Sequence, residues 1–351
     1  RRRHSQALGA VTIERHRGVD SLRLFEDVMP QLPELRYLVT VGEEDLWYDD
    51  RIFQFEDLLS AGAGRDYPAA EVTASDCFAL VYTSGTSGKP KGVELSHRNL
   101  LAAAGGTAAA LGLDGDDRLV GFSALFHVHG LGPGLLGSLL AGSSIILQDE
   151  SDAAGTLGAA GRHAATVRCA TPPHFVAELA ELEAQPRELG ALRLAVVSGA
   201  PVSDGLVNEI ARALDVPVVS GYSLTEAAST VSVCSPDDPP EARRFTVGRP
   251  IGGSEVRIVD ADAAAGDELP VESVGEIRVK GPGVMLGYYR QPRQTAEAFD
   301  ADGYFRTGDL GLVDEDGYLH LVGRTKDVII RSGFNVYPRE VETRIEAHPA
   351  V

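Results

Sequence analysis

The stretch VYTSGTSGKPKG, residues 81–92, constrains the possible fold more than any other part of the sequence. It follows the apolar run Phe78–Val81, which predicts a short buried strand, and it is rich in glycine, hydroxyl groups and lysine. Glycines here allow successive backbone N–H groups to turn toward one side and form a concave anion site. The stretch therefore predicts a strand followed by a phosphate-binding loop, and a flexible linker is the alternative interpretation.

The loop differs from a P-loop of the Walker type. That motif has four residues between its first glycine and its Gly-Lys pair, whereas only two residues separate Gly85 from Gly88. Pro90 also prevents a helix from starting at Lys89. A second segment, Gly92–Leu95, follows, so the loop is expected to join two strands.

Lysine is scarce in this chain and is concentrated at the loop. Only four of the 32 basic residues are lysine, and two of these, Lys89 and Lys91, lie in the loop. A compact ammonium group on a flexible stem suits a phosphate as a point charge. Chance placement in a surface loop is the alternative.

The rest of the sequence alternates between short apolar runs and Ala- and Leu-rich helical patterns. This alternation predicts an α/β protein whose large N-terminal domain has mostly parallel sheets covered by helices. The expected strands are 35–41, 78–82, 119–122, 144–147, 192–197 and 216–219, and the expected helices include 97–111 and 206–214. Ser96 is placed to cap the first of these helices.

From about Phe245 onward, short strands alternate with Gly and Asp turns. Asp316-Gly317 predicts a hairpin within residues 310–321, and this part of the chain predicts a smaller antiparallel β subdomain. The expected domains are residues 1–244, 245–323 and 324–351, the last being only the start of a small C-terminal domain.

Charge and cysteine content exclude several classes of protein. A net charge of −19 argues against nucleic acid or an anionic membrane as the main partner. Three scattered cysteines fit neither a disulfide framework nor a zinc site, which favours a reducing, cytoplasmic location. The N-terminal arginines precede too short an apolar run for a secretion signal, and the apolar stretch 124–147 predicts buried helix and strand, not a membrane span.

Six motifs occur in a fixed order along the chain. They are TSGTSGKPKG (83–92), ALFHVHG (124–130), SGAPVS (198–203), GYSLTEAA (221–228), GYFRTGDLG (303–311) and GRTKDVIIRSGFNVYPREVE (323–342). Together they resemble the adenylate-forming superfamily, which includes acyl-CoA synthetases, peptide-synthetase adenylation domains and luciferases. The resemblance extends from about residue 20 to the end, and the wording is most similar to fatty-acid and small-acid CoA ligases.

The resemblance implies a nucleotide site built from these motifs. In the phosphate loop it implies the nucleotide-binding residues Thr83, Ser84, Gly85, Ser87 and Gly88 and the catalytic residues Thr86 and Lys91. In the fourth motif it implies that Tyr222, between Gly221 and Ser223, stacks on adenine, that Thr225 contacts the α-phosphate and that Glu226 holds Mg²⁺. A helix cap is the alternative for Thr225 and Glu226.

Other motifs complete the expected nucleotide site. Gly199 and Ala200 follow an expected strand, where small residues let a flat base approach the backbone, and a tight turn is the alternative. Asp309 and Arg324 are expected at the ribose hydroxyls, as acidic residues are in other nucleotide folds, and an ordinary turn residue is the alternative for Asp309.

Two further residues are assigned by the resemblance alone. His127 is expected to gate and orient substrates between the acyl pocket and the nucleotide, and a satisfied core histidine is the alternative. No role is expected for His129. Lys326 matches the catalytic hinge about which the small C-terminal domain rotates between the two reaction steps.

The implied reaction has two steps. A carboxylate attacks the α-phosphate of ATP and pyrophosphate leaves, and the thiol of coenzyme A then attacks the acyl-adenylate. The expected ligands are ATP or AMP, Mg²⁺, coenzyme A as co-substrate and a small-molecule acid. The alternatives are carrier-protein loading, activation of an amino-aryl acid or of an oxyanion such as nitrite in secondary metabolism, and a nucleotide-binding homologue without activity.

Two features depart from the superfamily pattern. The chain begins later than its relatives and ends 25 residues after Lys326, before the C-terminal catalytic lysine, so we expect a truncated chain that binds nucleotide better than it turns it over. Ser332 stands where CoA ligases often have glycine, which bears on the thiol tunnel.

Arg168 and Cys169 also depart from the superfamily pattern. Relatives often have a bulky side chain at Cys169, lining the acyl pocket. By strand alternation Arg168 faces away from Cys169, which predicts a surface salt bridge. An inward Arg168 would instead favour a second anionic group or an inorganic oxyanion.

Overall fold

The computed structural model describes residues 5–16, 18–42, 49–83, 90–121, 124–148, 152–200, 202–260, 267–331 and 334–346. The chain divides into two compact units. Unit 1 comprises residues 1–73 and 84–92, and unit 2 comprises residues 74–83 and 93–351. The expected domain boundaries after residues 244 and 323 stay predictions.

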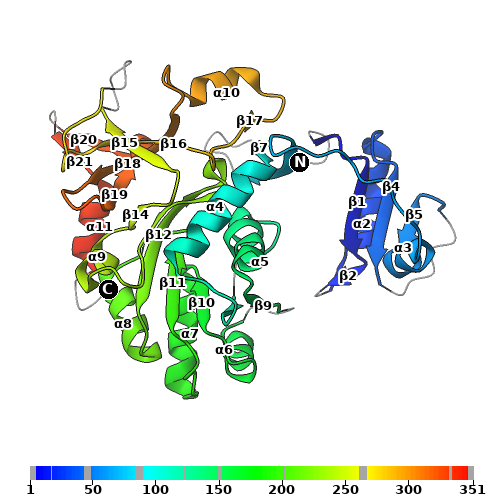
Figure 1. Cartoon of the computed structure of the whole chain (residues 1–351), viewed down its shortest axis with the longest axis horizontal. Helices are drawn as coiled ribbons and strands as arrows, with labels where there is room; N and C mark the ends of the chain where they lie inside the picture. The colour runs from blue at the N-terminus through cyan, green and yellow to red at the C-terminus, as the bar shows by residue number, and fades with distance from the viewer. Residues whose placement is uncertain are drawn as a thin grey trace. The chain divides into compact units, whose positions relative to one another are not determined.

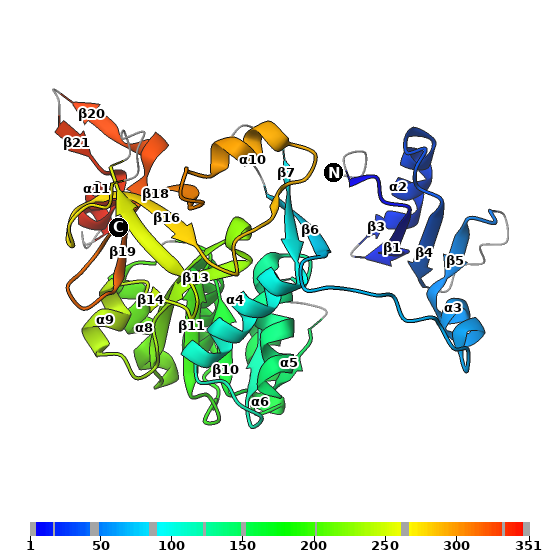
Figure 2. The same cartoon turned by 45° about the horizontal axis from the view of Figure 1, so that its top comes forward.

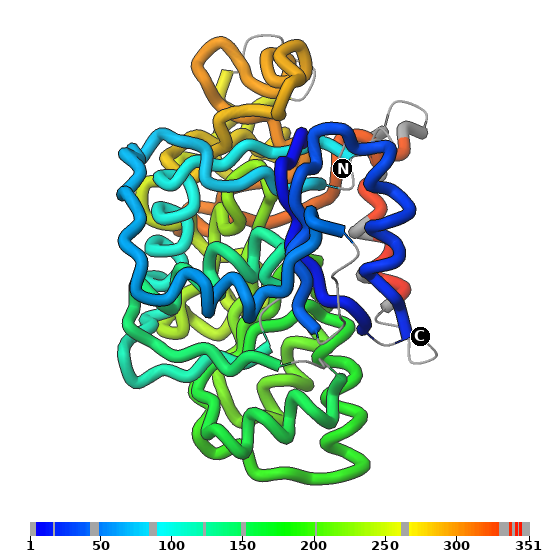
Figure 3. Tube along the Cα trace, turned by 90° about the vertical axis from the view of Figure 1, so that its right-hand side faces the viewer, coloured from blue at the N-terminus to red at the C-terminus, as the bar shows by residue number. Residues whose placement is uncertain are grey.

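Unit 1 contains a parallel three-stranded sheet in the order β1–β4–β5. Its elements are β1 (Gly9–Ile13), β2 (Arg15–His16), β3 (Val19–Asp20), α2 (Ser21–Val28), η1 (Met29–Gln31), β4 (Tyr37–Val41), β5 (Ile52–Gln54) and α3 (Phe55–Gly62). Helix α2 contacts β1 (Figure 3) and begins where the Asp20 carboxylate accepts a hydrogen bond from the Arg23 N–H. Leu22 and Phe25 of this helix pack with Leu38 and Ile52 in the core of the unit.

The phosphate-loop motif connects two neighbouring strands. An irregular segment, residues 63–76, leads from α3 to β6 (Cys77–Thr83) (Figure 2). Strand β7 (Lys91–Ser96) lies between β6 and β17 (Gly287–Tyr288) in a three-stranded sheet. The two strands that flank the motif agree with the sequence prediction, while residues 84–89 lie outside the described residues.

Unit 2 is built around a seven-stranded sheet in the order β14–β13–β12–β11–β10–β8–β9. The strands are β8 (Arg118–Val120), β9 (Ser144–Ile146), β10 (Val167–Ala170), β11 (Leu194–Ser198), β12 (Val218–Leu224), β13 (Ser229–Val233) and β14 (Arg249–Pro250). Strands β8 to β12 pair in parallel, whereas β13 and β14 are antiparallel.

Helices cover this sheet on both faces (Figure 1). The helical elements are α4 (His97–Ala110), η2 (Gly130–Leu136, a π-helix), α5 (Gly137–Ala141), α6 (Ala153–Arg162), α7 (Pro172–Ala184), α8 (Asp204–Leu214) and α9 (Pro240–Phe245). Val196 of β11 packs in the core that contains Leu100 of α4, and the adjacent Val197 packs with Phe175 of α7. Apolar residues on both faces explain the nearly continuous apolar runs of the sequence.

A second, antiparallel sheet has the order β15–β16–β18–β19. Its strands are β15 (Glu255–Val259), β16 (Gly275–Lys280), β18 (Phe305–Val313) and β19 (Leu319–Arg324), and α10 (Pro292–Ala298) precedes β18. At the predicted hairpin, Gly317 adopts a φ of +82° and its N–H donates to Asp314 O. η4 (Thr325–Asp327), β20 (Ile329–Arg331), β21 (Phe334–Val336) and α11 (Pro338–Glu346) follow.

The α/β fold class with an antiparallel β part is therefore confirmed. The Ser96 cap of α4 is also present, since Ser96 Oγ accepts from the Asn99 N–H and Asn99 Oδ1 accepts from the Ser96 N–H. Across the described ranges, every helix is too short or too polar to cross a bilayer.

The location of Arg168 differs from the expectation in one respect. It forms an ion pair, with its Nε 3.1 Å from Glu178 Oε2, but both side chains are buried. Glu178 lies on α7, which covers this face of the sheet, whereas Cys169 packs in the core on the opposite face. The predicted salt bridge and the orientation away from Cys169 are therefore present, but the predicted surface location is wrong because a helix covers the strand at this point.

Candidate active site

Tyr222, Asp309 and Arg324 form a hydrogen-bonded cluster. They lie on β12, β18 and the last position of β19. The Tyr222 hydroxyl donates to Asp309 Oδ2 at 2.5 Å, and Arg324 Nε lies 3.0 Å from Asp309 Oδ1. Asp309 and Arg324 are direct cross-strand partners, so the β18–β19 pairing fixes their separation. The fold thus brings together three residues that the sequence predicts at one nucleotide site.

The carboxylate of Asp309 is only slightly exposed to solvent. Burial raises the pKa of Asp309, while the hydrogen bond from Tyr222 and the charges of Arg324 and Lys326 oppose this shift. Burial, together with the Asp309 carboxylate, raises the pKa of the Tyr222 hydroxyl well above its ordinary value. Tyr222 is therefore a hydrogen-bond donor at neutral pH. Lys326 is exposed in η4, directly after this cluster in the chain.

Glu226 lies in η3 (Thr225–Ala227), the short turn that follows β12. The Tyr288 hydroxyl donates to Glu226 Oε1 at 3.0 Å, and the Met285 N–H donates to Glu226 O at 2.8 Å. Burial, with the adjacent Glu226, raises the pKa of Tyr288. Nothing in the sequence pointed to Tyr288, which is 62 residues away from Glu226.

The described residues contain no cluster of three or more His, Cys, Asp or Glu side chains that could hold a metal ion by themselves. Mg²⁺ is commonly held by one or two carboxylates together with water and substrate phosphates. The single carboxylate of Glu226 fits that kind of site. A metal here would share its ligands with a nucleotide.

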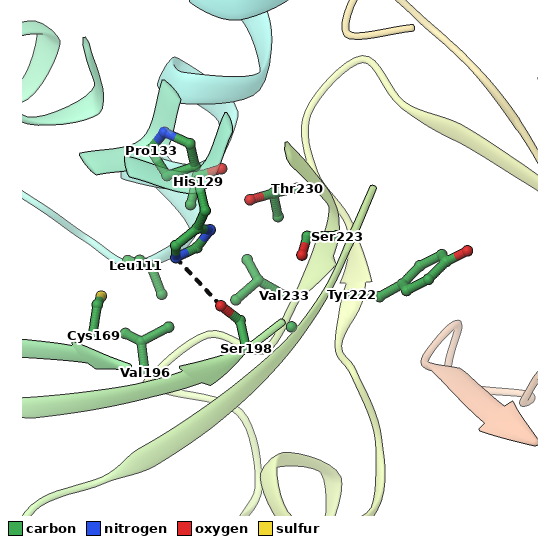
Figure 4. A pocket seen from close by; sticks show the side chains of 12 residues that line it. Leu111, His129, Pro133, Cys169, Val196, Ser198, Tyr222, Ser223, Thr230 and Val233 are labelled. Carbon is green, nitrogen blue, oxygen red and sulfur yellow. Dashed lines mark hydrogen bonds between the residues drawn. The ribbon is translucent and has the colours of Figure 1, made fainter. Parts of the chain in front are cut away.

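A small cavity, with room for about one water molecule (≈ 10 Å³), lies beside β11, β12 and β13 (Figure 4). It is lined by Thr107, Leu111, His129, Pro133, Cys169, Val196, Ser198, Gly221, Tyr222, Ser223, Thr230 and Val233. His129 points toward Ser198, with 3.3 Å between Nε2 and Ser198 Oγ, and its Nδ1 lies 3.1 Å from Ser229 Oγ. Most of the remaining wall is apolar.

His129, for which no role is expected, lines this cavity. Burial, with the nearby His127, lowers the pKa of His129 from 6.5 to about 4, so the ring is neutral at pH 7. His127, in contrast, is exposed, and its Nδ1 accepts a hydrogen bond from the His129 N–H. The gating role of His127 stays a prediction.

Strand β12 separates the cavity from the Asp309 cluster. Gly221 and Ser223 line the cavity, while the ring of Tyr222 between them points away from it (Figure 4). A Cβ at Gly221 would lie 3.2 Å from Ser232 O, so a larger residue has little space there. One strand therefore contributes to both parts of the candidate site.

The remaining predicted residues are placed as follows. Gly199 and Ala200 are exposed at the end of β11, and Gly199 has a φ of +85°. Thr83 ends β6 in unit 2, and Lys91 begins β7 as part of unit 1. Ser84, Gly85, Thr86, Ser87, Gly88 and Ser332 lie outside the described residues.

Comparisons with known proteins show the family to which the chain belongs. Residues 3–289 match the family described as AMP-binding enzyme. The chain is similar to the 2-succinylbenzoate–CoA ligase of Bacillus velezensis, with 37% identity over 84% of this chain and 58% of the relative.

Two solved structures are also similar. One is the anthranilate CoA ligase AuaEII in complex with anthranoyl-AMP, which has a TM-score of 0.88 at 27% identity, over 99% of this chain and 65% of that chain. ATP-bound MatB from Rhodopseudomonas palustris has a TM-score of 0.84 at 30% identity, over the same shares of the two chains. The chain thus spans less than two thirds of the length of these proteins.

Proposed function

The chain belongs to the AMP-binding enzyme family, and from this premise we propose that it activates a carboxylic acid with ATP and transfers the acyl group to coenzyme A. The first step forms a bond from the acid's oxygen to the α-phosphorus and releases pyrophosphate. In the second step the thiol attacks the acyl carbon and AMP leaves. The relatives described as CoA ligases support this choice of acceptor.

The observation that carries the proposal is the Tyr222–Asp309–Arg324 cluster. A buried carboxylate, oriented by two donors, is suited to accept hydrogen bonds from both hydroxyls of a ribose. Tyr222 also offers an aromatic ring beside that carboxylate, where adenine would stack. The small residues Gly199 and Ala200 would let the base approach the backbone.

The transferring phosphate would be bound next to the sugar. Thr225 and Glu226 lie in the turn η3 at the end of β12, the strand that carries Tyr222, so the proposed phosphate and metal ligands come shortly after the proposed adenine residue on the chain. Mg²⁺ would neutralise charge that develops on the phosphate oxygens. We further assign Thr83 to Gly88 and Lys91 to the phosphates, where backbone N–H groups and an ammonium stabilise the leaving pyrophosphate. No general base is required for an acid that is already ionised.

We assign the residues around the cavity beside His129 to the wall of the acyl site, which has to widen to admit an acid because the cavity holds only about one water molecule. A neutral imidazole and largely apolar walls would suit the uncharged part of an acid. A carrier protein is the alternative acceptor to coenzyme A in this proposal. The proposed location of the protein is the cytoplasm.

Binding and turnover would be tested together. AMP binding is measured by calorimetry, and release of pyrophosphate is measured with ATP, Mg²⁺ and a panel of aliphatic, dicarboxylic and aromatic acids. Coenzyme A and a phosphopantetheinylated carrier protein are offered as acceptors in parallel. We expect AMP binding and thioester formation on coenzyme A with at least one acid. A chain that does not bind AMP would refute the proposal.

A further inference from the structure

Residues 281–288 lead from β16 to β17 and contact three separate parts of the chain. Asn99 Nδ2 on α4 donates to Pro282 O and to Val284 O, each at 2.7 Å. The Met285 N–H donates to Glu226 O at 2.8 Å, and the Leu286 N–H donates to Glu94 O at 2.9 Å. The path of this segment is therefore fixed by α4, by the Glu226 turn and by β7.

Tyr288 is the last residue of this segment, and contacts hold both its backbone and its side chain in place. Its backbone pairs with Val93 of β7, and its N–H donates to Thr295 Oγ1 at 2.9 Å. The side chain is only 7% exposed, and its hydroxyl donates to Glu226 Oε1 at 3.0 Å. Such a hydroxyl cannot leave Glu226 without a change in the surrounding packing.

The same segment thus binds both the backbone and the side chain of Glu226. Met285 binds its backbone carbonyl and Tyr288 binds one of its two carboxylate oxygens. Among the described residues, Oε2 has no hydrogen-bond donor of its own. A carboxylate oriented through one oxygen and open at the other is typical of metal ligands, whose neighbours set their direction.

We propose that Tyr288 is a positioning residue for the metal-binding carboxylate: its hydroxyl orients Glu226 through Oε1 so that Oε2 can bind the Mg²⁺ that accompanies the nucleotide. The inference rests on the proposed function. Strand β7, which pairs with Tyr288, is also the strand that leaves the phosphate-loop motif. The segment 281–288 therefore joins the exit of that motif to the metal carboxylate.

The test compares Tyr288→Phe with Tyr289→Phe. Each change removes one hydroxyl. Tyr289 is the next residue in the chain, and within the described residues its hydroxyl forms no hydrogen bond with Glu226. The affinity for ATP is measured by calorimetry on the full chain, once with Mg²⁺ and once with EDTA. The ratio of the two affinities gives the gain in ATP affinity due to Mg²⁺.

We expect Tyr288→Phe to lower this gain about 10-fold, the size typical for loss of a residue that orients a metal ligand. Its affinity for metal-free ATP should stay within about 2-fold of the wild type, and Tyr289→Phe should resemble the wild type in both conditions. In a Glu226→Gln background, which lacks the metal carboxylate, Tyr288→Phe should have no further effect.

Three outcomes would overturn the inference. Equal gains in the wild type and Tyr288→Phe would show that the hydroxyl does not act on the metal ligand. An equal loss of affinity with Mg²⁺ and with EDTA would show a structural role only. A wild-type chain whose ATP affinity is the same with and without Mg²⁺ would refute the proposed function and this inference together.

Discussion

At the scale of single residues, His129 is half-buried and contacts two hydroxyl groups. Its pKa is about 4 in the folded chain and 6.5 when the residue is exposed, so between these values the unfolded chain binds more protons. The stabilising effect of this residue is complete above pH 6.5 and is lost as the pH falls toward 4. For His129 alone the loss at pH 5 is about 2 kcal/mol.

His129→Gln keeps a polar side chain and removes the titration. We predict that the loss of unfolding free energy between pH 8 and pH 5 is about 2 kcal/mol smaller in this variant than in the wild type, measured by urea unfolding. His163→Gln, at an exposed position, serves as control and should match the wild type. The same pH dependence in all three proteins would contradict the prediction.

Asp309→Asn keeps the shape of the side chain and removes its charge. Hydrogen bonds to a charged group contribute about 1.5–3 kcal/mol, so we predict roughly 10- to 100-fold weaker binding of AMP, measured by calorimetry. Asp316→Asn makes the same chemical change at the exposed hairpin turn and should bind AMP like the wild type. If both variants bind equally well, Asp309 does not contact the nucleotide.

The sequence predicted the members of the Asp309 cluster but not the environment of the histidines. His127 and His129 are two residues apart, and the choice of which one faces the cavity depends on how the backbone enters η2 and packs on α4. Neither position carries a local signal for that packing. Tyr288 was missed for a related reason, because its partner Glu226 is distant in the sequence.

At the scale of elements, the Arg168–Glu178 pair joins β10 to α7 inside the protein. Arg168→Met alone leaves the Glu178 carboxylate buried without its cation, and we predict a loss of about 3–5 kcal/mol in the free energy of unfolding. The double variant Arg168→Met/Glu178→Leu removes both charges and should lose less than the single variant. Urea unfolding of the single and double variants measures both effects.

The matched control is the pair Arg293–Glu297 on α10, at a comparable distance but with side chains 88% and 61% exposed. Solvent screens such a pair, so Arg293→Met should cost at most about 0.5 kcal/mol. A similar cost at both sites would show that burial of the Arg168 pair does not determine its contribution.

Most strands and helices were predictable because apolar runs and caps are local signals. The sequence predicted a strand within 35–41 and a cap at Ser96, and both are present. The two-residue strands β14 and β17 carry no such signal, since they form by pairing with strands already in place. The π-helix η2 contains Pro133 and several glycines, so its helical form depends on packing against α4.

At the scale of the whole chain, the segment 63–76 between α3 and β6 is irregular and mostly exposed. We predict that a protease specific for glutamate cuts after Glu71 before it cuts within any helix or strand of unit 2, because the exposed chain can extend into the protease without unfolding. Mass spectrometry of a brief digest would detect fragments 1–71 and 72–351. Glu71→Gln should remove this cut, and earlier cleavage inside the elements of unit 2 would contradict the prediction.

The chain has two compact units. The assignment of residues to the two units was not predictable. Residues 84–92 belong to unit 1, although β6 before them lies in unit 2 and β7 continues into unit 2. Sequence patterns report local periodicity, whereas assignment to a unit depends on contacts between distant segments.

The contacts of His129 have a consequence for the cavity that its ring lines. A neutral imidazole has one protonated and one bare nitrogen, so the ring donates to one serine while it accepts from the other. Exchange between the two tautomers, with rotation of both hydroxyl protons, reverses these directions without moving a heavy atom. Ser198 Oγ can then offer either a proton or a lone pair to a water molecule in the cavity, which has room for about one.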